Sequence, residues 1–400
     1  METLALLFLF AAGVGMAAIA AQHLVLWIHV RQAPPVPRRT PPVSILKPLC
    51  GVDDGLAANL ASFSALAYPE YEVVLGVRDV RDAAYPLALA AARRWPGRFR
   101  VALQRGEPGL NPKVNQLATL ARAARHDLLV VSDSNVRVHP AYLSEIAALL
   151  EDQGVGLVTH PISGVGEASV GSLMDHLHLA GSITPGIVGA QRLAGRDLVV
   201  GKSMALRRAD LQALGGFEAV KDVLAEDWVL GVRVGAVLGK RVAIARRPVE
   251  NVSERRTVRD FAGRYRRWGV LQRQAVGPVA YAALALLNPV LVAALAALAD
   301  PVPRTVAAFA GVCAAKAALD GAVARALRPG GFRLAQLACV PAKDLVFGAA
   351  WLHGLVRRDV VWRGKRIHVT RGTRIVGQPH VAGATPAPEL PVGGGAAAIS

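Results

Sequence analysis

A short polar stretch, Asp133-Ser134-Asn135, follows directly on an apolar run and carries the first signal for chemistry in this chain. The run, Leu128–Val131, is typical of a β-strand that is buried on both faces. Open α/β sheets bind their ligands at the carboxyl ends of such strands. Asp, Ser and Asn also favour turns, so a plain turn is the alternative interpretation. The position makes Asp133 the first candidate site residue.

Further acids and bases occur where the chain should return to the same edge of a sheet. Asp79 follows the apolar run Tyr71–Val77. Lys113 falls in the first turn of a predicted helix, where a cation opposes the helix dipole, which favours ligand binding over an exposed lysine. Glu226 and Asp227 begin another helical pattern, where the dipole alone would also favour a carboxylate.

A basic and aromatic segment, Arg264–Trp268, precedes the apolar C-terminal region. Apolar side chains recur at helical spacing from Val258 through Phe261 and Tyr265 to Trp268, with arginines on the other faces. The pattern predicts an amphipathic helix at a membrane surface. The same helix could carry site residues, which would put the mouth of the site beside the lipid.

Taken in order, these residues resemble the D, D, D, (Q/R)xxRW pattern of membrane-bound inverting glycosyltransferases. Finer matches are similar to the ceramide glucosyltransferase-like branch, which includes bacterial glycosyltransferases associated with hopanoid biosynthesis. The matching stretches are Gly109–Asn115, Ser132–Val138, Gly201–Met204 and Val361–Gly364. The resemblance extends over residues 43–370.

The resemblance implies a role for each candidate residue. Asp79 would contact the uridine of a UDP-sugar, Lys113 its diphosphate, and Asp133 and Glu226 would complete the donor-binding set. Asp227 would be the general base that takes the proton of the acceptor hydroxyl. The remaining catalytic residues implied are Arg264, Arg267 and Trp268.

The resemblance also implies a divalent cation, Mg²⁺ or Mn²⁺, because such ions bind one or two carboxylates together with substrate phosphates. Many such enzymes have Asp-x-Asp at this point, whereas this chain has Asn135 in place of the second acid. Asn135 still offers a carbonyl oxygen, so the predicted metal ligands are Asp133 and Asn135.

Apolar runs alternate with helical patterns from residue 43 onward, which predicts an α/β fold with a mostly parallel sheet and helices on both faces. The predicted strands include Tyr71–Val77, Val101–Gln104, Leu128–Val131 and Val155–Thr159; the helices between them are Gly55–Ala67, Ala83–Arg94, Lys113–Arg125 and Pro140–Glu151. By resemblance the domain is GT-A-like (Rossmann-like), with N- and C-terminal transmembrane helices. Neither a P-loop nor G-x-G-x-x-G follows the first strand.

Apolar segments at the two ends of the chain predict membrane association. The predicted parts are an N-terminal anchor (1–30), a Pro-rich linker (31–42), a cytoplasmic catalytic domain (43–257), the amphipathic helix (258–274), a membrane region (279–356) and a basic, then disordered tail (357–400). Arg31 follows the first apolar run, which favours a retained anchor over a cleaved signal peptide. Lys343 and Asp344 interrupt the last apolar segment, so Leu334–Val356 is predicted to be re-entrant or interfacial.

The chain has 400 residues and a net charge of +17, with arginines beside the apolar segments. This arrangement favours an anionic membrane surface and a diphosphate ligand over nucleic acid as partners. The three cysteines are far apart and match neither metal-site nor disulfide spacing.

The expected function is transfer of a sugar from a UDP-sugar, UDP-N-acetylglucosamine, to a hydroxyl of a membrane lipid at the bacterial inner membrane. The expected acceptor is a hopanoid such as bacteriohopanetetrol, with ceramide or another lipid as the alternative. Two other classes stay open. One is a processive polysaccharide synthase, which shares the motifs but needs a channel of several helices. The other is a membrane lipid-binding scaffold that keeps the fold without the activity.

Overall fold

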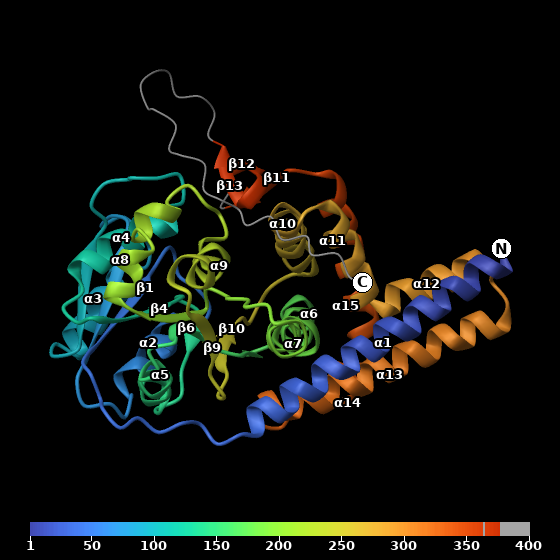
Figure 1. Ribbon diagram of the computed structural model, residues 1–400, viewed down its shortest axis with the longest axis horizontal. Helices are drawn as coiled ribbons and strands as arrows, with labels where there is room; N and C mark the ends of the chain where they lie inside the picture. Colours follow the sequence, from blue (N-terminus) through green and yellow to red (C-terminus); the bar gives the residue numbers. More distant parts are fainter. Residues whose placement is uncertain (363–364, 377–400) are drawn as a thin grey trace.

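The computed structural model describes residues 1–362 and 365–376, and it shows an α/β domain joined to a group of long helices (Figure 1). The main sheet has seven strands in the order β3-β2-β1-β4-β8-β6-β9. Only β8 runs antiparallel to its neighbours, so the predicted α/β fold with a mostly parallel sheet is confirmed. The strands are β1 (Val43–Pro48), β2 (Tyr71–Val77), β3 (Phe99–Leu103), β4 (Leu128–Ser132), β6 (Val155–Thr159), β8 (Ser203–Arg207) and β9 (Arg241–Ile244).

Successive residues of the central strands point to opposite faces of the sheet, and helices cover both of these faces. Ile45 of β1 packs in one core cluster and Leu46 in another. The first cluster is formed with α2 (Leu56–Ser64), α3 (Tyr85–Arg94) and α5 (Tyr142–Leu150). The second is formed with α4 (Pro112–Ala123), α8 (Arg208–Ala213) and α9 (Glu226–Leu238). The central strands are therefore mostly apolar on both faces.

A smaller sheet, β5-β10-β7, extends from the carboxyl end of β4. Its strands are β5 (Val136–Arg137), β7 (Ile162–Val165) and β10 (Val249–Val252). From β7 the chain continues through α6 (Val170–His178), a π-helical turn (Leu179–Ile183) and α7 (Thr184–Ala194) before it returns to β8. This excursion joins the α/β domain to the long helices through a shared apolar cluster that contains Leu177, Val188, Leu26 and Val323.

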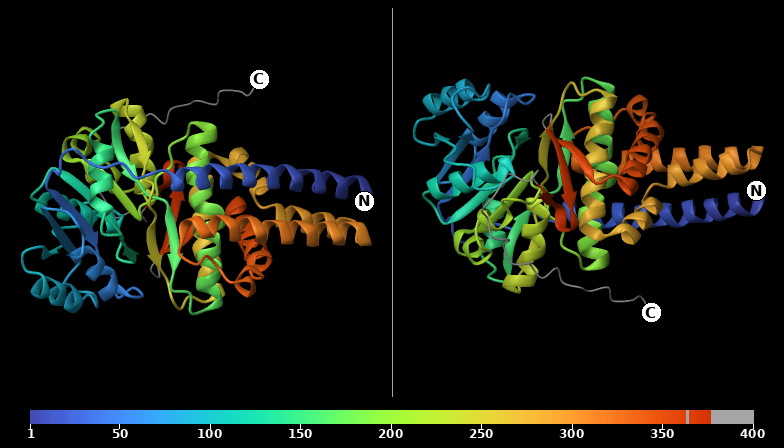
Figure 2. Two further views of the ribbon diagram at one scale, coloured as in Figure 1. Left: turned by 90° about the horizontal axis from the view of Figure 1, so that it is seen from below. Right: turned by 90° about the horizontal axis from the view of Figure 1, so that it is seen from above.

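The long helices α1 (Glu2–Arg31), α12 (Pro289–Ala299) and α13 (Pro303–Leu327) project from one end of the α/β domain, as perpendicular views show (Figure 2). By length and composition, α1 and α13 could each cross a membrane, and a bent pair, Pro278–Leu287 with Pro289–Ala299, could form a third span. The two parts of that pair meet at 83°. An ion pair of 2.7 Å between Arg304 and Glu2 places the α12–α13 turn beside the N-terminus.

Four charged residues in the apolar C-terminal segments are buried together. Lys316 and Asp320 of α13 lie against Lys343 and Asp344 of α15 (Val340–Val356), with ion-pair distances of 2.7 Å within α15 and 3.5 Å from Lys343 to Asp320. Charges in an apolar environment persist when they are paired with one another. The Lys343–Asp344 pair therefore faces protein, and α15 packs against α10 and α6 as well as against α12 and α13.

The segment after α15 forms a third sheet from β11 (Asp359–Trp362), β12 (Lys365–Thr370) and β13 (Arg374–Val376), which the sequence analysis did not predict. This sheet packs on the loop before α9. Leu224 N–H donates to the Thr373 carbonyl (2.9 Å), and Ile375 N–H donates to the Asp222 carbonyl (2.8 Å). The end of the tail, residues 379–400, which is the part predicted to be disordered, lies outside the described residues.

The helix α10 (Val258–Val276) begins at a capping box in which Thr257 and Asp260 each bind the other's backbone N–H. Its predicted apolar face contacts α6 and α15, with Phe261, Tyr265 and Ala350 in one cluster. Protein thus buries Phe261 and Tyr265, whereas Val258 at the start of this face is exposed and Trp268 is partly buried. The crossing with α15 is close, because a Cβ atom on Gly354 would lie 2.8 Å from the Gly269 carbonyl carbon and 2.3 Å from the Tyr281 hydroxyl.

Gly354→Ala should destabilise the protein, because the added methyl forces α10 and α15 apart, and overpacking of this kind costs about 1–3 kcal/mol. Gly263→Ala is the matched control, since a Cβ there meets nothing within 4 Å and alanine favours the helix by about 1 kcal/mol. Thermal unfolding of the detergent-solubilised protein should show a lower Tm for the first variant only. Equal Tm values would mean that the crossing can relax.

Candidate active site

Asp133, directly after β4, lies between two lysines. Its Oδ1 is 2.9 Å from Lys113 Nζ and its Oδ2 is 3.2 Å from Lys202 Nζ. Antiparallel pairing of β4 with β8 matches Ser132 with Ser203, so Lys202 and Asp133, one residue beyond this pair, are brought face to face. The register of β4 with β8 thus explains the contact between Asp133 and Lys202.

Lys113 provides the link to the helix α9. Its Nζ is also 2.8 Å from Glu226 Oε1. The Asn111 side chain caps α4 by accepting from the N–H groups of Lys113 and Val114, and its Nδ2 donates to Glu226 Oε2 (3.3 Å). Lys113 is thus not the exposed first-turn lysine of the alternative interpretation, because two carboxylates from different elements bind it.

Asp227 follows Glu226 and lies beside the same lysine. Its Oδ2 accepts from Gly201 N–H (2.6 Å), and its Oδ1 accepts from Trp228 N–H (2.8 Å). Burial and the neighbouring charge of Glu226 raise the pKa of Asp227 to about 6, although Lys113 acts in the opposite direction. A carboxylate with a pKa near neutral pH can accept a proton in a reaction and release it again.

Electrostatic coupling holds the other groups in defined charge states. Burial by itself would raise the pKa of Asp133, but Lys113 and Lys202 outweigh this effect. They hold the pKa of the carboxyl well below its usual range. Burial opposes the charge on Lys113, yet Asp133 and Glu226 raise its pKa above the ordinary value. Burial lowers the pKa of Lys202, and Asp133 offsets only part of that shift. Of the two lysines, Lys202 is therefore the one that loses its proton more readily.

A third lysine, Lys47 at the end of β1, lies on the protein side of Asp133. Its Nζ donates to the Asp133 carbonyl (2.6 Å) and lies 4.0 Å from the centroid of the Phe63 ring. Burial lowers the pKa of Lys47 to about 7. The sequence analysis missed this residue, although a lysine inside the apolar run Val43–Leu49 was a signal.

Arg264 of the (Q/R)xxRW segment is buried and pairs with Asp175 of α6 at 2.8 Å. The Tyr265 hydroxyl donates to the other oxygen of Asp175 (2.9 Å). Burial opposes the charge on Arg264, but Asp175, Tyr265 and Asp133 raise its pKa, so the guanidinium lies within electrostatic reach of Asp133. The sequence analysis missed Asp175, whose signal was an acid among the apolar residues of the segment Val170–His178.

The other two residues of that segment lie on the same helix. Trp268 is partly buried, and the Arg264 guanidinium is 5.5 Å from its ring centroid. Arg267 is also partly buried.

Asp79 is not part of this cluster. It follows β2, two strands from β4, which corresponds to about 10 Å at the usual strand spacing. Its Oδ1 accepts from Arg81 N–H (2.8 Å), and its side chain is 40% exposed. Asp79 and Asp133 lie at the same edge of the sheet, but they are not in direct contact.

Lys202 binds both predicted metal ligands, Asp133 and Asn135. Asn135 Oδ1 accepts from Lys202 Nζ (2.7 Å), and both Asp133 oxygens face ammonium groups. Within residues 1–362 and 365–376, no group of three or more His, Cys, Asp or Glu side chains could hold a metal ion. A hard divalent cation prefers oxygen ligands that are not already bound to cations. The residues at this position therefore do not fit Mg²⁺ or Mn²⁺.

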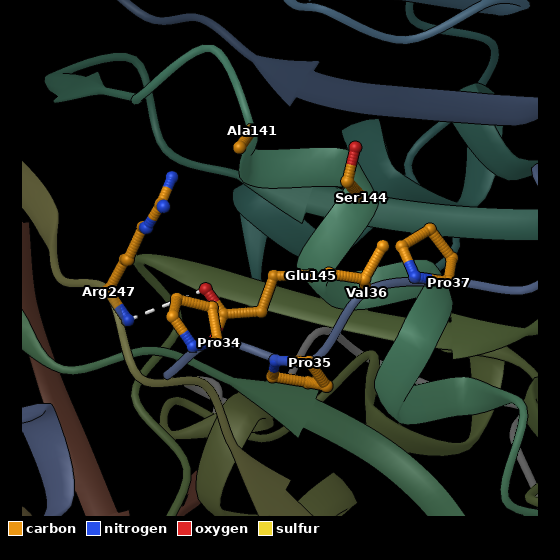
Figure 3. A pocket seen from close by; sticks show the side chains of 8 residues that line it. All are labelled: Pro34, Pro35, Val36, Pro37, Ala141, Ser144, Glu145 and Arg247. Carbon is orange, nitrogen blue, oxygen red and sulfur yellow. Dashed lines mark hydrogen bonds between the residues drawn. The ribbon is translucent and has the colours of Figure 1, made fainter. Parts of the chain in front are cut away.

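A small cavity lies on another part of the domain, between the Pro-rich segment and α5 (Figure 3). It is lined by Pro34, Pro35, Val36, Pro37, Ala141, Ser144, Glu145 and Arg247. Glu145 accepts from the backbone N–H groups of Arg246 and Arg247, so its carboxylate is occupied. The cavity contains none of the candidate site residues.

Comparison with known proteins identifies similar sequences and folds. Ceramide glucosyltransferase 1 of Caenorhabditis elegans is 28% identical over 239 residues, which cover 57% of this chain and 49% of that protein. The ceramide glucosyltransferase of Komagataella phaffii is 29% identical over 204 residues, 45% of this chain and 40% of that protein. The chain thus spans about half the length of the curated relatives that it matches.

Among solved structures, the mannosyltransferase PcManGT from Pyrobaculum calidifontis, in complex with GDP-Man and Mn²⁺, has a TM-score of 0.48 and 19% identity. The match covers 87% of this chain and 99% of that one. The family Glycosyl transferase family 21 matches residues 7–375, nearly the whole of this sequence. The chain belongs to glycosyl transferase family 21.

Proposed function

We propose that this protein is an inverting glycosyltransferase that moves a sugar from a UDP-sugar to a hydroxyl of a membrane lipid. The observation that carries the proposal is the cluster in which Lys113 joins Asp133 and Glu226 beside Asp227. It combines a cation for a phosphate leaving group with a carboxylate whose pKa suits a general base. The family and the two candidate membrane spans support a lipid acceptor.

The proposed reaction is a single displacement. Asp227 accepts the proton of the acceptor hydroxyl while the hydroxyl oxygen attacks the anomeric carbon on the face opposite the diphosphate. The bond from the anomeric carbon to the diphosphate oxygen breaks, and negative charge develops on the departing UDP. Lys113 stabilises this charge by an interaction that strengthens as the bond breaks. Gly201 N–H holds the Asp227 carboxylate in place through its bond to Oδ2.

The remaining residues have supporting roles in this proposal. Asp79 contacts the uridine at the outer part of the sheet edge. Asp133 holds Lys113 and Lys202, and Glu226 holds Lys113 from the opposite side. Arg264, Arg267 and Trp268 close the site on the side of α10. No step is assigned to Mg²⁺ or Mn²⁺, because the predicted ligands do not fit a divalent cation.

We propose UDP-N-acetylglucosamine as the donor and a hopanoid polyol such as bacteriohopanetetrol as the acceptor. Resemblance to bacterial glycosyltransferases of hopanoid biosynthesis and an Ala-, Arg- and Gly-rich composition support this choice. The names of the curated relatives make ceramide the alternative acceptor.

Mass spectrometry of lipids from cells with and without the gene tests this choice, together with transfer by the purified protein. Loss of an N-acetylglucosaminyl hopanoid would support the proposal. A missing glycosylceramide would identify the alternative, and a polymeric product would indicate a synthase. Absence of both donor hydrolysis and transfer would favour a lipid-binding scaffold.

Asp227→Asn should reduce transfer about 100-fold or more, because the amide cannot accept the proton. UDP binding should be largely kept. In the wild-type protein kcat/KM should fall as the pH drops below about 6, since the base is then protonated. Glu218→Gln is the control, because this exposed acid lies outside the cluster. Near-normal turnover of Asp227→Asn would remove this residue from the role of base.

The buried Arg264–Asp175 pair should matter for both folding and transfer. Arg264→Met alone leaves Asp175 buried without its partner charge, which costs about 3–5 kcal/mol. The double variant Arg264→Met/Asp175→Leu should regain most of the stability, because an apolar pair of similar volume replaces the ion pair. Its transfer rate should stay at least 10-fold low, since the positive charge near Asp133 is lost.

Tm and turnover of the two variants separate these roles, with exposed Arg266→Met on the same helix as the control. Full recovery of turnover together with Tm in the double variant would show that Arg264 has a purely structural role.

We propose that the α/β domain is cytoplasmic at a bacterial inner membrane, with the N-terminus and the Asp300–Arg304 turn on the other side. The Arg304–Glu2 ion pair supports this topology by holding those two segments together. Anionic lipids would then meet the arginines that follow α1, including Arg31.

A reporter fused after Arg374 should be active in the cytoplasm, because Leu334–Val356 is expected to be re-entrant or interfacial. A fusion after Asp300 should show periplasmic activity and serves as the positive control. Periplasmic activity of the Arg374 fusion would instead require a further membrane crossing.

A further inference from the structure

We propose that Lys202 takes the place of a divalent cation at the donor site, so that the nucleoside diphosphate is bound by ammonium groups without a metal. This inference rests on the proposed function, because it concerns the donor of the same site. It makes Lys202, which has no assigned role so far, a substrate-binding residue.

The position of Lys202 carries the argument. Its Nζ lies 3.2 Å from Asp133 Oδ2 and 2.7 Å from Asn135 Oδ1. These two side chains are the ones that the Asp-x-Asp comparison assigns to a metal. The ammonium nitrogen thus lies between the two oxygen atoms that a bound cation would use.

The identity of Asn135 fits a lysine better than a metal. Asn135 Nδ2 donates to Asn251 Oδ1 (3.1 Å), which leaves its Oδ1 directed to Lys202. An aspartate at 135 would lack this donor, so the Asn251 amide would have to rotate to donate instead. An amide at 135 donates to Asn251 and accepts from Lys202 at the same time, whereas a carboxylate can only accept.

Lys202 supplies part of the charge that a divalent cation would bring. Lys113, Lys202, Asp133 and Glu226 together are neutral, from two positive and two negative groups. Lys202 contributes +1 where a divalent cation would contribute +2, but it adds N–H donors for the phosphate oxygens.

Both lysine side chains are partly exposed. The side chain of Lys113 is 21% exposed and that of Lys202 is 13% exposed. Lysine has a flexible stem, so Nζ can turn from Asp133 to a phosphate oxygen without movement of the backbone. Glycine at position 201 lets the backbone approach both groups closely, because a Cβ atom there would lie 2.9 Å from Lys113 Nζ and 3.0 Å from Asp227 Oδ2.

The test is UDP binding by calorimetry with the full-length protein in detergent, in excess EDTA and in Mg²⁺ or Mn²⁺. The wild-type protein should bind UDP with similar affinity in all conditions. Lys202→Met should weaken binding about 10- to 100-fold in EDTA, the range for loss of a charge-assisted hydrogen bond. Lys240→Met should not change it, because Lys240 pairs with Asp210 beyond the other end of α9. Tm values of both variants verify folding.

A second variant tests the inference in the opposite direction. Asn135→Asp/Lys202→Met restores two carboxylates and removes the ammonium group, so its UDP binding should become dependent on Mg²⁺ or Mn²⁺. Binding by this variant that remains insensitive to the cations would count against the proposed exchange of lysine for metal.

Wild-type UDP binding that disappears in EDTA and returns with Mg²⁺ or Mn²⁺ would overturn the inference and leave the proposed function intact. Failure to bind UDP in every condition would overturn both. Because binding is measured without an acceptor, the result does not depend on which lipid is glycosylated.

Discussion

The arrangement of the candidate site depends on the ion pairs of Asp133. This carboxylate ends β4, and its two oxygens face Lys113 from α4 and Lys202 from the start of β8. The lysines therefore tie α4, β4 and β8 together. A partly buried carboxylate without these partners would be easier to protonate or would destabilise the fold, since charges removed from water require partners.

From this point the network extends to the candidate base. Lys113 binds Glu226, and Gly201, the neighbour of Lys202, donates its N–H to Asp227. The helix α9 is thus positioned by the same two segments that position Asp133. The third sheet supports this arrangement from the other side, because Thr373 binds the backbone just before α9. Asp227 is consequently held in place, and burial beside Glu226 keeps its pKa high.

A second set of buried charges connects the site to the long helices. Arg264 and Asp175 join α10 to α6, and Lys316, Asp320, Lys343 and Asp344 join α13 to α15. Each set is internally paired, which allows charged residues to occur in apolar segments. The motif-bearing helix α10 packs against α15, and these charges join α15 to α13. These contacts connect the candidate site to α13, which by length and composition could cross a membrane.

The sequence by itself determined the strand–helix alternation, the edge at which Asp133 lies, and the apolar helices at the two ends. These features follow from local periodicity: Tyr71–Val77 and Val155–Thr159 were predicted with the bounds that the structure has. Only the tertiary structure placed Lys47, Lys202 and Asp175, because their partners lie 86, 69 and 89 residues away along the chain. The pairing of β8 with β4, the third sheet and the protein cover on the apolar face of α10 were also decided by long-range contacts. A pattern of residue types shows which side chains can carry charge, but which charges neutralise one another depends on how distant segments pack.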